Sequence, residues 1–337
     1  MKIVMDKRIP GLLEGLHSLM PGELEILALE GPQIKREDVK DAEVLFVRTR
    51  TRCDESLLKD SKVKLIGSAT IGIEHIDIPW CENSGIRVIN APGCNAPAVM
   101  QYVACSLNKA GFDLSRHTLG VVGKGSIGSL VVELYRRAGA KVIVCDPPRE
   151  ASHFNDEVYL PIEELLQNCD AVTFHVPYTS EGPYPTHHLL STPLPERLKI
   201  IINASRGLVI NPEIITSDKK FIIDTWSFED CVSLISETEK GRLIDSAFIA
   251  TPHIAGYSIE GKQRATAAML RAFAEYVGIS HSQNMEKTDE KKYNYNLSDV
   301  VLSFDPTPLS NALKHDPDKF ESLRANHLRK EPQPEKN

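Results

Sequence analysis

Short runs of β-branched residues alternate with longer amphipathic stretches along most of the chain. The first ninety residues contain five such runs: Lys2–Met5, Glu25–Ala28, Val44–Val47, Lys64–Gly67 and Arg87–Asn90. A second series follows: Thr118–Gly123, Lys141–Asp146, Ala171–His175, Ile200–Asn203, Phe221–Asp224 and Phe248–Thr251. This alternation is typical of parallel β-sheets covered by helices. The pattern therefore predicts an α/β protein with two sheets.

The pair Pro92-Gly93 marks the boundary between the two series, because it stops a strand. A helix is predicted from about Ala98 to Lys109, where the chain crosses into the second series. Another is predicted over Lys262–Val277, whose apolar residues recur at spacings of three and four. The expected domains are residues 1–94 with 254–285, residues 95–253, and a last piece over residues 286–337.

The last piece has its own order signals. The stretch Ser280–Ser298 is polar and is predicted to be a linker. Asp316 is a candidate helix cap, with Pro317 at the first helical position. Phe320, Leu323 and Leu328 then form a short apolar stripe. A segment this small cannot build its own core, so we expect it to dock on another surface.

Composition narrows the class of protein. The 337 residues are 42% hydrophobic and 25% charged with a net charge of −7, which argues against nucleic acid or an anionic membrane as partner. No apolar run is long enough for a membrane span, and the start does not resemble a secretory signal. Seven scattered cysteines without a C-x-x-C pair indicate reduced thiols. We therefore expect a cytoplasmic protein with no metal site.

The strongest local motif is Gly123-Lys-Gly125-Ser-Ile-Gly128, between a predicted strand and a predicted helix. Such a loop gives a tight turn, close backbone approach to a pyrophosphate, and a helix N-terminus facing the phosphates. Asp146 ends the next strand, where it can bind both ribose hydroxyls and repel a 2′-phosphate. The motif therefore predicts NAD rather than NADP. The alternative is an ordinary glycine turn with a strand-end aspartate.

Three polar side chains follow successive predicted strands: Arg206, Glu229 and His253. In open α/β sheets the ligand crevice lies outside the carboxyl ends of the strands, so we expect the three to converge. Hydride transfer with a 2-hydroxy acid needs a cation for the carboxylate, an acid/base for the hydroxyl and a group that tunes that base. Taken singly, each has a plainer interpretation, and a lone histidine after Thr-Pro is more often structural.

The run from Val47 to Arg52 contains three arginines at every second position. Arg48, Arg50 and Arg52 would share one face if the strand continued. A phosphate group would suit such a positive patch on an acidic protein. The alternative is a solvated strand edge that charge keeps soluble.

These motifs occur together in a known order. The segments that carry the likeness are Val88–Ala96, the glycine loop, Cys145–Arg149, Gly182–Tyr184, Asn203–Gly207, Asp224–Trp226 and Thr251–Tyr257. Over essentially the whole chain they resemble the D-isomer-specific 2-hydroxyacid dehydrogenase family. Asp-Pro-Pro-Arg, Gly-Pro-Tyr, His-Ile-Ala-Gly-Tyr and the C-terminal stretch Pro317–Arg324 are narrower marks. They resemble the branch that oxidises 4-phospho-D-erythronate at C2 to the 2-oxo acid in vitamin B6 biosynthesis.

The resemblance implies two Rossmann-like or flavodoxin-like domains with a cleft between them, residues 1–94 with 254–285 binding substrate and 95–253 binding NAD. It implies catalytic roles for Arg206, Glu229 and His253. Implied cofactor contacts are Gly123, Gly125, Ser126, Ile127, Gly128, Asp146, Val176, Ala204, Ser205, Asp224 and Gly256. Implied substrate contacts are Arg48, Thr49, Thr70 and Tyr257. It also implies a homodimer, in which the residues after about Asp299 pack on a second copy and cover Phe304, Leu309, Phe320 and Leu323.

The chain departs from the family pattern in several places. The helix after Leu107 is shorter, residues are missing between Arg206 and Asp224, others are added between Glu229 and His253, and Gln101 stands where Glu is common. Two other functions remain open. One is a dehydrogenase for another 2-hydroxy acid such as phosphoglycerate, and the other is a non-catalytic NAD-sensing protein.

Overall fold

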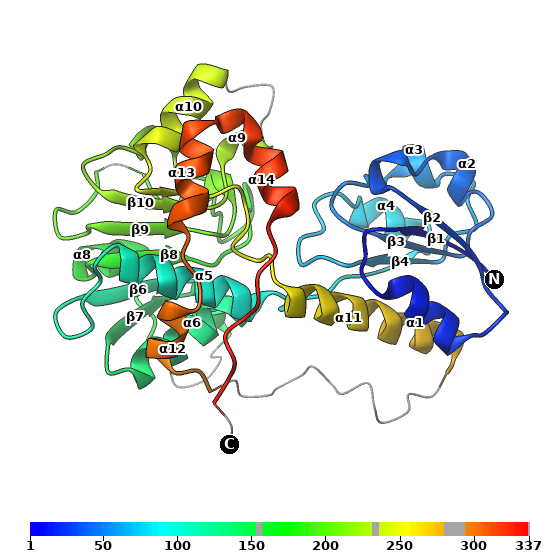
Figure 1. Ribbon diagram of the computed structural model, residues 1–337, viewed down its shortest axis with the longest axis horizontal. Helices are drawn as coiled ribbons and strands as arrows, with labels where there is room; N and C mark the ends of the chain where they lie inside the picture. Colours follow the sequence, from blue (N-terminus) through cyan, green and yellow to red (C-terminus); the bar gives the residue numbers. More distant parts are fainter. Residues whose placement is uncertain (153–156, 192, 231–235, 280–293, 336–337) are drawn as a thin grey trace. The chain divides into compact units, whose positions relative to one another are not determined.

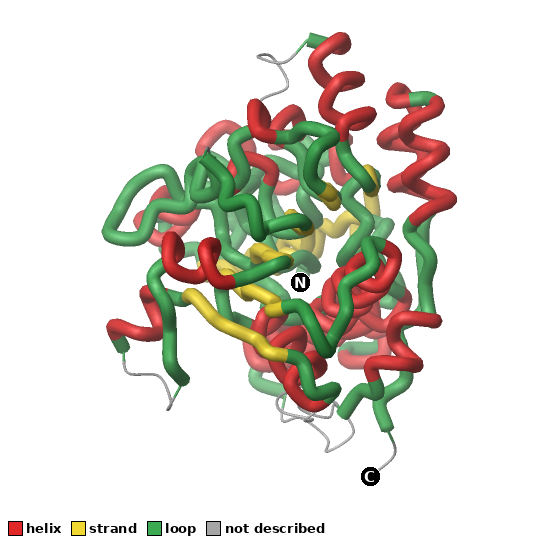
Figure 2. Tube along the Cα trace, turned by 90° about the vertical axis from the view of Figure 1, so that its left-hand side faces the viewer, coloured by secondary structure: helices red, strands yellow, loops and turns green. Residues whose placement is uncertain are grey.

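A computed structural model describes residues 1–337 except 153–156, 192, 231–235, 280–293 and 336–337. Helices and parallel strands alternate along the described chain (Figure 2). The eleven predicted strands are all present, and each of their ends lies within one residue of the prediction. The chain divides into two compact units, Met1–Asn95 with Ser258–Lys291, and Ala96–Tyr257 with Lys292–Asn337. The expected fold class is confirmed.

The first unit contains a five-stranded parallel sheet in the order β2-β1-β3-β4-β5. Its strands are β1 (Lys2–Asp6), β2 (Glu25–Leu29), β3 (Val44–Val47), β4 (Leu65–Ser68) and β5 (Arg87–Ile89). This order is that of flavodoxin-like sheets. Successive side chains of β1 point to opposite faces, so Ile3 and Met5 join one core cluster and Val4 joins the other.

Helices cover both faces of this sheet (Figure 1). One face packs against α1 (Leu12–Leu19) and α11 (Ile259–Val277), through Leu12, Leu16, Met269 and Phe273. The other face packs against α2 (Arg36–Val39), α3 (Glu55–Leu58) and α4 (Ile78–Asn83). The long helix α11 confirms the helix predicted at this place and begins three residues earlier, where the side chain of Ser258 caps it by accepting from Gly261 N.

The second unit contains a six-stranded parallel sheet in the order β11-β10-β9-β8-β6-β7. Its strands are β6 (Thr118–Val122), β7 (Lys141–Cys145), β8 (Ala171–Phe174), β9 (Ile200–Asn203), β10 (Lys220–Ile223) and β11 (Ile249–Ala250). A single parallel bridge from Val144 to Tyr159 extends the sheet beyond β7. With that bridge the order is the one found in dinucleotide-binding sheets. The order in which successive strands are added to the sheet reverses between β6 and β8. This switch point places the ligand crevice at the carboxyl ends of these two strands.

Helices also cover this sheet on both faces. On one face lie α5 (Ala96–Lys109) and α6 (Ser126–Arg137), and on the other lie α8 (Ile162–Asn168) and α10 (Glu237–Ser246). The other described helices of this unit before the C-terminal segment are α7 (Pro147–Ala151) and α9 (Ser227–Asp230), with short 3₁₀ turns at Gly207–Val209 and Pro212–Ile214; a third 3₁₀ turn, Gly31–Gln33, lies in the first unit. Helix α10 lies between Glu229 and His253.

The C-terminal segment packs on its own chain. It contains α12 (Leu297–Leu302), α13 (Thr307–His315), a 3₁₀ turn (Pro317–Lys319) and α14 (Phe320–Asn326). Phe304 and Leu309 pack on one core cluster of the second unit, and Phe320 and Leu323 belong to the other. Phe320 is thus buried within its own chain and not by a second copy, whereas the covering of the other three by a second copy stays a prediction. In Figure 1, α13 and α14 lie along the second unit's own helices.

Two smaller expectations for this segment also need correction. Helix α12 begins inside the stretch predicted as a linker, because Asn296 caps it by accepting from Ser298 N at 2.9 Å; residues 280–293 of that stretch lie outside the described residues. Asp316 makes no side-chain cap, since its carboxylate pairs with Lys319 at 3.1 Å instead.

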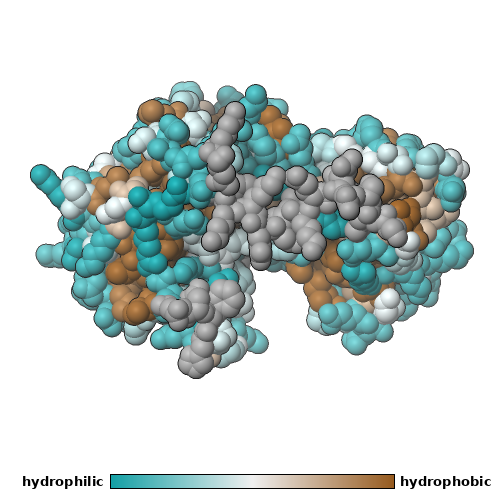
Figure 3. All heavy atoms as spheres, turned by 90° about the horizontal axis from the view of Figure 1, so that it is seen from below, coloured by the Kyte–Doolittle hydropathy of each residue, from teal (hydrophilic) through white to brown (hydrophobic). Residues whose placement is uncertain are grey.

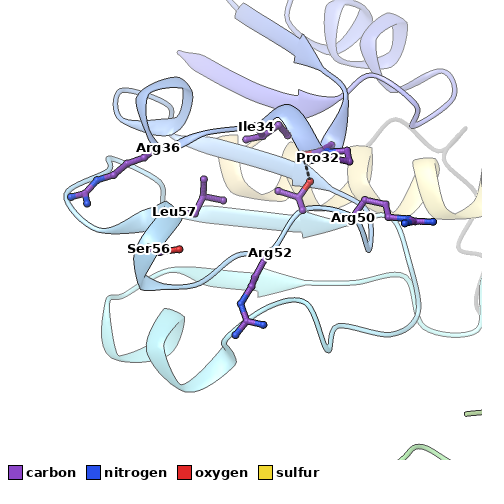
Figure 4. A pocket seen from close by; sticks show the side chains of 9 residues that line it. Pro32, Ile34, Arg36, Arg50, Arg52, Ser56 and Leu57 are labelled. Atoms are coloured by element: carbon purple, nitrogen blue, oxygen red, sulfur yellow. Dashed lines mark hydrogen bonds between the residues drawn. The ribbon is translucent and has the colours of Figure 1, made fainter. Parts of the chain in front are cut away.

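The arginine run does not continue β3 as a strand. The strand ends at Val47, and a turn follows because Thr51 N donates to Arg48 O at 3.2 Å while Thr51 Oγ1 donates to Gly31 O at 3.0 Å. The three arginines therefore do not share a face. In Figure 4, Arg50 and Arg52 point away from each other around a shallow surface pocket.

The described surface is mixed in character. Hydrophilic residues cover most of the face shown in Figure 3, and hydrophobic residues form smaller patches. The most exposed large hydrophobic side chains include Leu302 at 83% and Val158 at 76%. Within the described part of the chain, no helix has the length and apolar character that crossing a membrane requires.

Candidate active site

The glycine loop is built for close approach of a ligand to the backbone. Gly123 has a φ of 87°, and a Cβ there would lie 2.5 Å from the carbonyl oxygen of His175. A Cβ on Gly128 would overlap the carbonyl oxygen of Gly123, so this helix can approach the strand only without a side chain. A Cβ on Gly125 would meet nothing within 4 Å. Open space therefore lies beside the N-terminus of α6, where backbone N–H groups favour an anion.

Asp146 lies at the end of β7 and is tied to the glycine loop. Its Oδ2 accepts from Lys124 N at 2.7 Å, and its Oδ1 accepts from Arg149 N at 3.1 Å, which caps α7. The residue is only 9% exposed. Each carboxylate oxygen has two acceptor sites, so these bonds leave capacity for ribose hydroxyls. The hydrogen bond from Lys124 N thus fixes Asp146, the residue predicted to bind the ribose, to the backbone of the glycine loop.

His253 and Glu229 form a close pair. His253 Nδ1 lies 2.7 Å from Glu229 Oε2, and the side chains are 33% and 17% exposed. Burial acts to lower the pKa of His253, but the charge and hydrogen bond of Glu229 outweigh it, so the pKa is raised above its ordinary value. Burial acts to raise the pKa of Glu229, but the charge and hydrogen bond of His253 hold it below its ordinary value. A carboxylate only accepts, so Nδ1 carries the proton and Nε2 is the nitrogen available for proton transfer.

The backbone at the histidine is unusual. His253 has a φ of 55°, in the left-handed region that non-glycine residues seldom adopt. Asp224, buried at the end of β10, accepts from Ile254 N and Ala255 N, both at 2.8 Å. These bonds hold the two peptides after the histidine in place. Burial raises the pKa of Asp224. The Asp224 carboxylate therefore has a structural role in holding this backbone, in addition to any contact with a cofactor.

Trp226 connects the three proposed catalytic residues. Its backbone N–H donates to Glu229 Oε1 at 3.0 Å, and its indole Nε1–H donates to Thr251 O at 2.8 Å, two residues before His253. A Cβ on Gly207, the residue after Arg206, would overlap the Trp226 backbone. The side chain of Trp226 is fully buried. We did not predict this connection, and the only sequence signal was the tryptophan after Asp224-Thr.

Arg206 lies in a loop that is held on both sides. Asn203 Nδ2 donates to Arg206 O at 2.8 Å, and Asn203 Oδ1 accepts from Ser205 N and Oγ at 3.2 and 2.9 Å. Arg206 Nη1 donates to Ser205 O at 2.8 Å, and the residue is half-buried. The fold of the second unit thus brings the loops of Arg206, Glu229 and His253 onto the same tryptophan.

The other residues predicted to contact the cofactor also follow strands of the second unit. Val176 comes after β8, and its Cγ1 would lie 2.9 Å from a Cβ on Gly123. Ala204 and Ser205 come after β9, and Gly256 follows the peptides that Asp224 holds. They thus lie where the sheet order places the crevice.

Three of the residues predicted to contact the substrate belong to the first unit. Arg48 Nε donates to the buried Asp6 Oδ2 at 2.9 Å, and Thr49 is exposed. Thr70 Oγ1 lies 2.6 Å from Ser68 Oγ, which in turn lies 3.2 Å from His75 Nε2. The fourth, Tyr257, belongs to the second unit. Arg324, from the C-terminal segment, donates to its hydroxyl at 3.0 Å.

Comparison with known proteins identifies the family. The model of the D-isomer specific 2-hydroxyacid dehydrogenase catalytic domain matches residues 19–285. The chain belongs to this family. It is 37% identical to the erythronate-4-phosphate dehydrogenase of Bacteroides fragilis, over 98% of this chain and 97% of that protein. It is 40% identical to the Azotobacter vinelandii protein of the same name, over 83% of this chain and 73% of that protein.

Solved structures of the family share the fold. The NAD-bound 3-phosphoglycerate dehydrogenase of Entamoeba histolytica superimposes with a TM-score of 0.66 at 27% identity, covering 82% of this chain and 95% of that one. The D-lactate dehydrogenase of Aquifex aeolicus, complexed with NAD and lactic acid, gives 0.63 at 24% identity, covering 82% and 96%. The family match ends at residue 285, whereas the Bacteroides relative matches nearly the whole chain. The C-terminal segment therefore lies beyond the match to the family's catalytic domain.

Proposed function

We propose that this chain is an NAD-dependent dehydrogenase that oxidises 4-phospho-D-erythronate at C2 to the 2-oxo acid. The observation that carries the proposal is the pair of His253 and Glu229, joined through Trp226 to the loop of Arg206. The relatives named erythronate-4-phosphate dehydrogenase support this choice of substrate. The activity would belong to vitamin B6 biosynthesis.

The proposed chemistry follows from the roles that these side chains can perform. Neutral His253 Nε2 takes the proton of the C2 hydroxyl as the C2–H bond breaks and the carbonyl forms. Glu229 stabilises the resulting imidazolium through Nδ1. Arg206 binds the C1 carboxylate and polarises the C2 oxygen. NAD, when bound, accepts the hydride from C2.

The residues of the second unit fit NAD. The glycine loop leaves room for the pyrophosphate beside the N-terminus of α6, and Asp146 would bind the ribose hydroxyls. The further contacts that we propose follow β6, β8, β9, β10 and β11 (Ser126, Ile127, Val176, Ala204, Ser205, Asp224 and Gly256). A 2′-phosphate would face the Asp146 carboxylate, so NAD should bind more tightly than NADP.

We propose that Arg48 and Thr49 bind the substrate phosphate, with Thr70 and Tyr257 as further substrate contacts. Asp6 holds Arg48 through Nε, and a guanidinium has further N–H donors for an anion. Arg50 and Arg52 have no assigned part, because the turn after β3 separates the three arginines.

The proposal is tested by measuring NADH formation with 4-phosphoerythronate, erythronate and 3-phosphoglycerate, each with NAD and NADP. We expect the highest kcat/KM with 4-phosphoerythronate and NAD. Arg48→Ala should lower kcat/KM for the phosphorylated substrate by about one to two decades, the value of a charge-assisted contact, and leave NAD affinity unchanged. Equal use of erythronate and its phosphate would remove the role of Arg48, and a preference for 3-phosphoglycerate would establish the other dehydrogenase activity.

We further propose that the protein is a cytoplasmic homodimer that pairs through its C-terminal segment. The resemblance supports the dimer, and so does Leu302, a large hydrophobic side chain of α12 that is 83% exposed. The six described cysteines form no disulfide, which supports a reducing compartment.

A further inference from the structure

Helix α14 docks on the helix that carries Glu229. Phe320, the first residue of α14, is 5% exposed, and its ring packs edge-on against Phe228 with centroids 5.5 Å apart. Phe228 precedes Glu229 on α9 and also stacks on Trp226 at 5.5 Å. The C-terminal segment therefore contacts the element from which the catalytic pair is built. Figure 1 shows α14 next to α9.

Arg324, one turn further along α14, reaches two residues of the proposed site. Its Nη1 lies 3.5 Å from Glu229 Oε2, the same oxygen that holds His253 Nδ1. Its Nε donates to Tyr257 Oη at 3.0 Å, and the guanidinium lies 5.7 Å from the centre of the tyrosine ring. The side chain is only 16% exposed, so water screens these contacts weakly.

Arg329 fixes the backbone of the loop that follows His253. It is 8% exposed and donates to the carbonyls of Ile254, Ala255 and Ala98 at 2.7, 2.5 and 2.8 Å. Its Nε donates to Gln101 Oε1 at 2.8 Å. Burial lowers the pKa of Arg329 to about 10, which leaves the guanidinium charged at neutral pH. The C-terminal segment thus holds the loop after His253 at several points.

Arg324 affects the protonation of the catalytic pair, because it and His253 both contact the Glu229 carboxylate. The charged groups around His253 are Glu229, Asp224 at the end of β10, and Arg324 with its neighbour Glu321 on α14. Arg324 acts to lower the pKa of both His253 and Glu229. It therefore offsets part of the stabilisation that Glu229 gives to the imidazolium, and keeps the histidine a weaker base.

The tyrosine contact has a separate consequence. Because Arg324 Nε–H donates to the hydroxyl oxygen, the hydroxyl hydrogen of Tyr257 is directed away from Arg324. A tyrosine held in this way can donate to an anionic oxygen of a substrate.

We propose that Arg324 is a positioning residue of the active site, which pairs with the Glu229 oxygen that faces His253 and orients the hydroxyl of Tyr257 for substrate. The C-terminal segment then completes the active site of its own chain, beyond any part that it has in pairing two copies. This proposal rests on the proposed function for its effect on turnover, whereas its effect on the histidine can be measured without substrate.

The first test is an NMR titration of His253 in the full-length protein without substrate, assigned by the signal that His253→Gln lacks. We expect Arg324→Gln to raise the pKa of His253 and Arg324→Lys to restore part of the difference. Lys319→Gln is the matched control, because it removes one positive charge from the preceding turn, where Lys319 pairs with Asp316. Two-dimensional NMR spectra establish that each variant is folded. The same His253 pKa in Arg324→Gln and Lys319→Gln would overturn the proposal.

The second test uses turnover. Arg324→Gln should lower kcat/KM for oxidation about 10–100-fold and move its acid limb to higher pH, whereas Lys319→Gln should do neither. Combined with Tyr257→Phe, the loss should be less than additive, because both variants remove the same contact. Additive losses with an unmoved acid limb would contradict the proposal. If the wild type does not oxidise 4-phosphoerythronate, the proposed function fails, and the titration of His253 still decides the role of Arg324.

Discussion

His253 and Glu229 shift each other's pKa in opposite directions, through their charges and their shared hydrogen bond. The pKa of the histidine is raised and that of the glutamate is lowered, so the charged pair is favoured over the neutral one near neutral pH. For an oxidation, the raised pKa of His253 has two opposing effects. A stronger base takes the substrate proton more readily, but it is already protonated over a wider pH range.

We predict a pH dependence of opposite sign for the two directions of reaction. Oxidation needs neutral His253, so kcat/KM should fall as pH drops below the raised pKa of the histidine; reduction needs the protonated form, so kcat/KM should fall as pH rises above it. Glu229→Gln should move both limbs to lower pH, because the favourable charge is lost. His253→Ala should lower kcat about 10²–10⁴-fold. Superimposable pH profiles for wild type and Glu229→Gln would contradict the assignment.

For single residues, the sequence indicated the chemical groups of the candidate site but not the contacts that connect them. Arg206, Glu229 and His253 were expected to converge because each follows a parallel strand, and their loops do meet at Trp226. Arg324 could not be found in this way. It lies on a C-terminal helix, and its contact with Glu229 depends on how that helix docks rather than on any local pattern.

The elements themselves were more predictable than the contacts. Buried parallel strands are continuous apolar runs, so the strand positions could be predicted from residue type alone. The arginine run failed as a strand for a local reason. Thr51 N closes a turn by donating to Arg48 O, and the Thr51 hydroxyl donates to Gly31 O; period-two spacing cannot report either contact.

Gln101 illustrates a departure from the family pattern that the contacts explain. Its Nε2 donates to Ser303 Oγ at 2.9 Å and to Lys330 O at 3.1 Å, while its Oε1 accepts from Arg329. An ionised glutamate at this place could accept but not donate. The amide therefore suits the way in which helix α5 binds the C-terminal segment.

We predict that Arg329→Met destabilises the protein by at least about 2–3 kcal/mol, because buried carbonyls of Ile254 and Ala255 lose their donors. Urea unfolding at neutral pH measures the change. Arg116→Met is the control, because Arg116 is 83% exposed and pairs only loosely with Asp113 at 3.7 Å. Equal stability of the two variants would show that the carbonyls do not depend on Arg329.

For the whole molecule, the C-terminal segment has one role in its own chain and a second, in pairing, that we propose. Its inner face, with Phe320 and Arg329, belongs to the second unit. Leu302 is 83% exposed, and we propose that it contacts a second copy. The sequence could not separate these faces, because an apolar stripe on a short helix does not specify which surface covers it.

We predict that Leu302→Arg weakens self-association and leaves the fold intact, because the side chain is exposed and contributes little to the core. Light scattering over a range of concentrations measures the change in mass. Asn311→Arg on α13 is the control, because it adds the same charge at another exposed position of the segment. A variant that remains as associated as the wild type, or a wild type that is monomeric throughout, would rule out pairing through α12.

The central claim is that His253 removes a proton while hydride leaves C2 of 4-phosphoerythronate for the nicotinamide. The most direct measurement is a single turnover with 4-phosphoerythronate carrying deuterium at C2, followed by NMR of the reduced nicotinamide. We predict that the deuterium appears at C4 of the nicotinamide in wild type, and that His253→Ala slows its transfer about 10²–10⁴-fold. Reduced nicotinamide without deuterium, or none formed at all, would contradict the claim.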